Sequence, residues 1–291
     1  MLMAPHLDSR SESIRTRRAR PLLSTKQRYH EYLLQRIEDY KNSIPREELL
    51  NLGNDATSEL ESPAGVQYFL SEILLAETVD NLIKKRLNLP TFKKWRQQHA
   101  KLRLAQQSPT HWGLERRSAV AAVLPRLEAG DHALVVGGGA EAAVYLLAAH
   151  DVRVTCLVGD NATCTRIETR MAGEALTGAF EAYVAMLGTW FPRLEPVHFV
   201  VIDAGTLADL PSPRRVALMA RLQDVTVPGG LHAVMPGEAA VAAEAWVSLY
   251  PDWERVPLPG RAARKGTKRE TPPGILLTRP FPRPASQADS A

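Results

Sequence analysis

The sequence has little cysteine and no long apolar run. Its two cysteines, Cys156 and Cys164, provide neither a disulfide framework nor the ligand spacing of a zinc site. No apolar run approaches the roughly 20 residues that span a bilayer. No apolar core follows the basic residues of the N-terminus, as a secretory signal requires. We therefore expect a cytoplasmic protein with no metal site and no membrane segment.

The composition is that of an ordinary globular protein, because 45% of the 291 residues are hydrophobic and 23% are charged. This length accommodates one large domain or two modest ones. The net charge is only +4, but the basic residues cluster, which hints at a phosphate-bearing partner. The clusters are the arm 1–20, the segment 84–103 and the loop 261–269.

The first third of the chain predicts helices and no strand. Residues 1–20 contain five arginines and few apolar residues, which is typical of a disordered basic arm. Between residues 24 and 107 the apolar residues recur at helical spacing. Pro109 and Gly113 then break the pattern. We predict an all-α N-terminal domain over 21–113, which caps a cofactor site or makes a homodimer contact.

After residue 113 the pattern changes to strands that alternate with helices. This alternation predicts an α/β fold with a doubly wound, mostly parallel sheet over residues 114–280. Two last strand-like runs, 253–258 and 274–278, are joined by a polar loop and predict an antiparallel C-terminal hairpin. Residues 281–291 are predicted to be a disordered tail. The five earlier runs are 132–136, 152–158, 181–187, 197–202 and 231–235.

The most informative motif is the glycine-rich turn after the first of these runs. Gly137, Gly138 and Gly139 let the chain turn sharply. They also leave room for a ligand against the N–H groups that open the next helix. With Ala142, the turn satisfies the looser dinucleotide-binding fingerprint. We therefore predict that the three glycines bind a cofactor.

The order of these segments resembles the class I methyltransferase family, which uses S-adenosylmethionine. The resemblance implies that the glycine turn lies under the methionine part of the cofactor and that the second strand ends beside the ribose. It implies methyl transfer to an unidentified acceptor, with S-adenosylmethionine as cofactor. The predicted antiparallel hairpin is also typical of this family. The segments that carry the resemblance are 134–139, 154–158, 198–204 and 227–234.

The chain departs from the family's pattern at its acidic positions. The family has an acid two residues before the first glycine, where this chain has Val135, and a third glycine where it has Glu141. The second strand of the family ends in an acid that accepts both ribose hydroxyls, but here it ends in Val158. We predict that Glu141, Val158, Gly159 and Asp160 complete the cofactor site, although Glu141 would face the carboxylate of the cofactor.

Methyl transfer needs positioned reactants and, for some acceptors, a base. Asp203 follows the fourth strand and is the predicted catalytic residue; the alternative is that it caps the next helix. Thr206 is a weaker candidate. In the basic loop, Arg264, Lys265 and Lys268 are predicted to bind an anionic substrate, which is a small molecule or RNA.

Three functions stay open at this point. The first is an S-adenosylmethionine-dependent methyltransferase of unknown acceptor. The second is a catalytically degenerate member that keeps the fold as a binding or scaffold module. The third is an NAD(P)-binding oxidoreductase, although Val158 stands where that class has an acid. His198 and His232 lie within strand-like runs and are expected to be structural.

Overall fold

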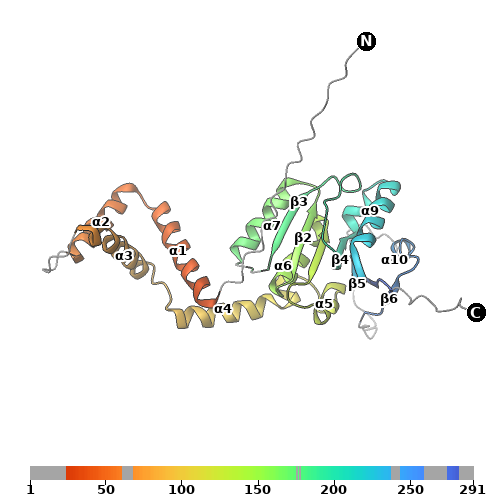
Figure 1. Cartoon of the computed structure of the whole chain (residues 1–291), viewed down its shortest axis with the longest axis horizontal. Helices are drawn as coiled ribbons and strands as arrows, with labels where there is room; N and C mark the ends of the chain where they lie inside the picture. The colour runs from red at the N-terminus through yellow and green to blue at the C-terminus, as the bar shows by residue number, and fades with distance from the viewer. Residues whose placement is uncertain are drawn as a thin grey trace, which may run out of the picture. The chain divides into compact units, whose positions relative to one another are not determined.

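The structure is a computed structural model, and it describes residues 24–60, 68–174, 176, 178–236, 243–258 and 274–281. The chain separates into two compact units, Met1–Arg96 and Gln97–Ala291 (Figure 1). The division falls inside helix α4 (Phe92–Gln106). None of the helices in the described part of the chain is long and apolar enough to cross a membrane. The predicted arm at 1–20 and residues 282–291 of the predicted tail lie outside the described residues.

The first unit consists of helices, as the sequence predicts. Helix α1 begins after Ser24, whose Oγ accepts a hydrogen bond from the Gln27 N–H at 3.3 Å, while Gln27 Oε1 accepts one from the Ser24 N–H at 2.8 Å. This reciprocal pair satisfies two N–H groups that the helix leaves free. Ile37, Leu52 and Ile83, one from each of three helices, form the buried centre. The helices are α1 (Thr25–Ser43), α2 (Arg46–Leu60), α3 (Tyr68–Arg86) and the first part of α4.

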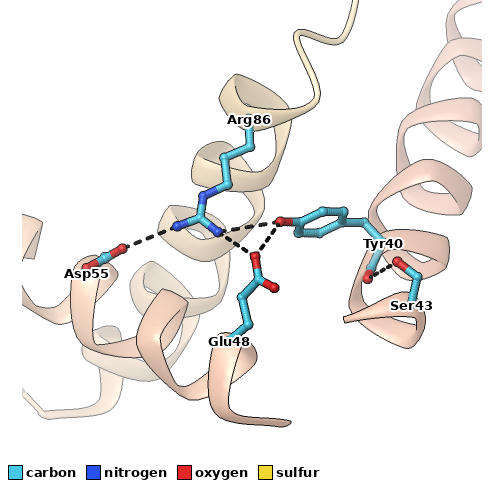
Figure 2. A network of polar contacts seen from close by, with 5 residues as sticks. All are labelled: Tyr40, Ser43, Glu48, Asp55 and Arg86. Carbon is cyan, nitrogen blue, oxygen red and sulfur yellow. Dashed lines mark hydrogen bonds and ion pairs between the residues drawn. The ribbon is translucent and has the colours of Figure 1, made fainter. Parts of the chain in front are cut away.

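Arg86 at the end of α3 connects three helices through polar contacts (Figure 2). Its Nη1 lies 3.2 Å from Glu48 Oε1 and its Nη2 lies 3.6 Å from Asp55 Oδ2, both on α2. Tyr40 of α1 donates its hydroxyl to the same Glu48 oxygen at 3.2 Å. Such exposed pairs contribute little stability each. Arg86 belongs to the basic segment 84–103. Glu48 and Asp55 therefore offset part of the positive charge of that segment.

One mixed sheet forms the centre of the second unit. Its strand order is β3-β2-β1-β4-β5-β7-β6. The pairs among β1 to β5 are parallel, whereas β7 runs antiparallel to β5 and to β6. The predicted fold class is therefore confirmed, including the antiparallel C-terminal pair and the all-α region before the sheet. The strands are β1 (His132–Val136), β2 (Arg153–Val158), β3 (Phe180–Val184), β4 (Val197–Asp203), β5 (Thr226–Met235), β6 (Glu254–Val256) and β7 (Ile275–Thr278).

Alternate residues of a strand point to opposite faces of the sheet. In this sheet both faces are apolar, and helices cover each of them. Ala133 and Val135 of β1 pack with buried residues of α5, α6 and α7. Leu134 and Val136 pack instead with residues of α9 and α10. The helices are α5 (Ala119–Val123), α6 (Glu141–Ala149), α7 (Asn161–Gly173), α8 (Ala204–Ala208), α9 (Ser212–Val225) and α10 (Ala243–Val247).

The segment 108–113, the predicted linker, belongs to the second unit. It includes a short 3-10 turn in which Trp112 is buried. Trp112 Nε1 donates to the Gln106 carbonyl at 2.6 Å, and its ring lies 5.2 Å from the ring of Tyr145 on α6. The Arg170 guanidinium of α7 lies over both rings. The end of α4 is thus anchored on the α/β unit, and the predicted boundary at residue 113 lies inside that unit.

A buried histidine in β5 has both ring nitrogens hydrogen-bonded. The Thr226 hydroxyl donates to the Leu222 carbonyl at 2.6 Å, so its oxygen accepts from His232 Nε2 at 2.8 Å. His232 Nδ1 then accepts from the Tyr250 hydroxyl at 2.8 Å. This arrangement needs a neutral imidazole, and burial lowers the pKa of His232 to about 3. His232 is therefore placed as a structural group.

We predict that His232 makes the free energy of unfolding fall on acidification. The pKa is about 3 in the folded protein and about 6.5 in the unfolded chain. The stabilisation is complete above about pH 6.5 and is lost at about 1.4 kcal/mol per pH unit below it. The variant H232Q lacks this dependence. Urea unfolding measures the free energy of unfolding of both proteins at about pH 7 and at about pH 5. The difference between the two free energies should become smaller at the lower pH. A difference that does not change with pH would contradict the neutral imidazole.

Candidate functional site

The glycine turn lies at the carboxyl end of β1, where the strand order of the sheet reverses. β1 pairs with β2 on one side and with β4 on the other. Gly137 has φ +100°, a conformation that favours glycine, and its N–H donates to the Leu157 carbonyl of β2 at 2.9 Å. A 3-10 turn then leads into α6 at Glu141. Ligands of open α/β sheets bind in the crevice at this reversal point.

Asp203, the last residue of β4, holds the glycine turn from its other side. Its Oδ2 accepts hydrogen bonds from the Gly139 N–H at 3.0 Å and from the Thr206 hydroxyl at 2.5 Å. Its Oδ1 accepts from the Gly205 N–H at 3.0 Å, which caps α8. Asp203 is only 7% exposed, and these donors satisfy its buried carboxylate. Asp203 therefore caps α8, which is the role that the sequence offered as the alternative to catalysis.

The space beside the glycines is filled by the protein itself. A Cβ on Gly137 would lie 2.6 Å from Asp203 Cβ and 2.8 Å from Thr206 Oγ1. A Cβ on Gly139 would lie 2.6 Å from Asp203 Oδ2, and one on Gly138 would lie 3.1 Å from Thr163 Cγ2 of α7. The turn thus needs glycine because β4, α8 and α7 pack closely against it, whether or not a ligand binds.

The carboxyl end of β2 is open. Val158 is buried, whereas Gly159 and Asp160 are exposed. A Cβ on Gly159 would meet no atom within 4 Å. Asp160 Oδ1 accepts from the Thr163 N–H at 2.8 Å and so caps α7. This hydrogen bond holds the pKa of Asp160 below its ordinary value, so the carboxylate is ionised at neutral pH.

Glu141 opens α6 and forms an ion pair with Arg166 of α7. The distance from Arg166 Nε to Glu141 Oε2 is 2.9 Å. The sequence predicted an unfavourable carboxylate beside the cofactor at this position. Arg166 offsets that charge, which weakens the repulsion toward an anionic group of a ligand.

Other predicted residues cannot be placed in this site. Arg264, Lys265 and Lys268 lie outside the described residues. The anion-binding loop that contains them stays a prediction. In the part of the chain that is described, no group of three or more His, Cys, Asp or Glu side chains is arranged to hold a metal ion.

The two ends of the predicted site differ in their fit to S-adenosylmethionine. At the ribose end, the exposed and ionised carboxylate of Asp160 suits a pair of hydroxyls, and the space at Gly159 is open. At the methionine end, the Gly139 N–H already donates to Asp203. The residues at the end of β2 therefore fit the ribose of the cofactor. The methionine part cannot use the Gly139 N–H, and it must lie outside the space that Gly139 and Asp203 fill.

Methyltransferases are among the solved structures that are similar to this chain. The N-methyltransferase NodS from Bradyrhizobium japonicum is 15% identical, with a TM-score of 0.45, and the match covers 57% of this chain and 94% of NodS. The glycopeptide N-methyltransferase MtfA is 15% identical, with a TM-score of 0.44 and coverage of 60% and 100%. An rRNA methylase from Streptococcus thermophilus is 13% identical, with a TM-score of 0.42 and coverage of 56% and 95%. No family model and no curated protein matches the chain.

Proposed function

We propose that the α/β unit binds S-adenosylmethionine and transfers its methyl group to an acceptor in the cytoplasm. The observation that carries this proposal is the glycine turn after β1 beside the exposed Asp160 after β2, in a sheet that ends in an antiparallel pair. Parallel neighbours have their carboxyl ends at one edge, which supports a shared site for both ends of the cofactor. The buried free cysteines, Cys156 and Cys164, are compatible with a reducing compartment.

Each residue of the site has a role in this proposal. The cofactor supplies an electrophilic methyl group on a sulfonium sulfur. Asp160 accepts hydrogen bonds from the ribose hydroxyls, and Gly159 leaves space beside them. Asp203 and Thr206 keep the glycine turn in one conformation, and Arg166 offsets the charge of Glu141. Positioning of this kind is the main requirement of methyl transfer.

A binding or scaffold module is the second candidate function. The observation that favours it is the hydrogen bond from the Gly139 N–H to the carboxylate of Asp203. An internal carboxylate there takes a donor that a ligand would otherwise use. In this candidate the glycine turn serves packing alone, and the α/β unit binds no nucleotide cofactor.

Calorimetric titration with S-adenosylhomocysteine, with NAD in parallel, separates these functions. We predict that the protein binds S-adenosylhomocysteine and not NAD. In the variant D160S the serine still caps α7 but cannot accept both ribose hydroxyls. Loss of one hydrogen bond to a charged acceptor is worth about 1.5–3 kcal/mol, so the affinity should fall by about 10-fold to 150-fold.

The matched control is E168A, which removes an exposed carboxylate of α7. It should bind S-adenosylhomocysteine as the unchanged protein does, and thermal unfolding should show that both variants fold. If the unchanged protein binds neither ligand, the binding module is the better assignment. Binding of NAD alone would support the oxidoreductase.

A further inference from the structure

The crossover between β3 and β4 is unusual because it contains no helix. Each residue from 185 to 196 is described, and none is helical. Parallel strands are usually joined through an α-helix that covers the sheet. Here Ala185 and Leu187 of the crossover are buried in one cluster with Leu218 and Leu222 of α9. The crossover is thus packed onto the face of the sheet that α9 covers.

The crossover and α9 line an open groove of about 640 Å³. Gly188 allows the close approach of the two segments, because a Cβ there would lie 2.8 Å from Arg214 Cβ. The volume is within the range of small-molecule sites, about 300–1,000 Å³. None of the residues that line the groove belongs to the glycine turn or to the end of β2. It is therefore a separate site.

The groove combines an aromatic ring, cations and a carboxylate. Trp190 is 51% exposed, which is unusual for so large an apolar side chain. Arg193, Arg221 and Asp224 are exposed and line the same groove. Among the described residues, no hydrogen bond or ion pair engages these four side chains. All of them are available to a ligand on this face.

We propose that this groove binds a nucleoside phosphate, either free or as a unit of single-stranded RNA. A base stacks on Trp190, as bases do on exposed aromatic side chains. Arg193 and Arg221 contact the phosphate. Asp224 accepts a hydrogen bond from a ribose hydroxyl or an exocyclic amine. The proposal uses the exposed aromatic ring and the three charged side chains of the groove, and it does not rest on methyl transfer.

The test uses the full chain and two kinds of probe. AMP and UMP are titrated by calorimetry, and labelled poly(A) and poly(U) strands of about 12 nucleotides are titrated by fluorescence anisotropy. The variants are W190A and R221Q. The control is R126Q, which removes an exposed arginine outside the groove. Thermal unfolding checks that each variant folds, as expected for exposed positions.

We expect W190A to weaken binding by about 5-fold to 150-fold, since removal of one aromatic side chain on which a base stacks lowers the affinity by about this factor. R221Q should reduce the slope of log K against log salt by about 1. R126Q should leave the affinity for mononucleotides unchanged. Binding of mononucleotides identifies a free nucleotide as the ligand, and binding of strands alone identifies RNA. The proposal is overturned if the unchanged protein binds none of the probes, or if W190A and R221Q bind as it does.

Discussion

Replacing Gly137 with alanine should destabilise the α/β unit by about 3 kcal/mol or more. The backbone of Gly137 has φ +100°, which costs another residue about 1–3 kcal/mol. The new Cβ would also overlap Asp203 Cβ and Thr206 Oγ1, which are 2.6 and 2.8 Å from its position. Overpacking of a close contact adds about 1–3 kcal/mol. Urea unfolding of the α/β unit measures the loss.

Gly159→Ala is the matched control for this substitution. Gly159 lies on the same edge of the sheet, but a Cβ there meets no atom within 4 Å, so the change in stability should stay within about 1 kcal/mol. A stable G137A protein that had lost only its affinity for S-adenosylhomocysteine would contradict the packing role of Gly137. The glycine would then serve the ligand.

Replacing Asp203 with alanine should cost about 3 kcal/mol of stability. The substitution leaves the Gly139 N–H, the Gly205 N–H and the Thr206 hydroxyl without their acceptor. Each unsatisfied buried donor costs about 1–3 kcal/mol, and partial exposure of these groups limits the sum. D203N should also be destabilised, because its amide NH₂ faces a donor. Urea unfolding of both variants measures the loss.

Thr206 provides the control for the Asp203 variants. T206S keeps the hydroxyl that donates to Asp203 Oδ2 and should retain most of the stability, whereas T206V should lose about 1 kcal/mol. Hydrogen exchange at the Gly139 amide should become faster in D203A, because that amide loses its acceptor. If D203A unfolds like the unchanged protein and only methyl transfer is lost, Asp203 is catalytic, as the sequence suggested.

The sequence predicted the fold because local patterns determine it. Apolar runs of strand length alternate with helical stretches, and this alternation requires parallel strands with covered faces. The polar loop between the last two strands is consistent with their antiparallel pairing. The sequence did not predict that the crossover 185–196 contains no helix. Its packing against α9 joins residues about 30 positions apart, and no local pattern relates them.

The candidate site could be predicted only in part. The glycines and Asp160 mark strand ends, which local sequence reveals. The contact between Gly139 and Asp203 joins residues 64 positions apart, and no spacing rule relates them. The sequence is therefore compatible with both capping and catalysis by Asp203, and only the pairing of β1 with β4 places its carboxylate against the glycine turn.

The sequence by itself determined the alternation of strands with helices, the antiparallel last pair of strands and the position of the glycine turn, because these follow from short-range periodicity and from backbone freedom. Only the tertiary structure decided which groups surround that turn. It put the Asp203 carboxylate on the Gly139 N–H, gave His232 two partners in the core and left Trp190 exposed beside α9. These contacts join distant parts of the chain, and they form only when the sheet and its helices have packed.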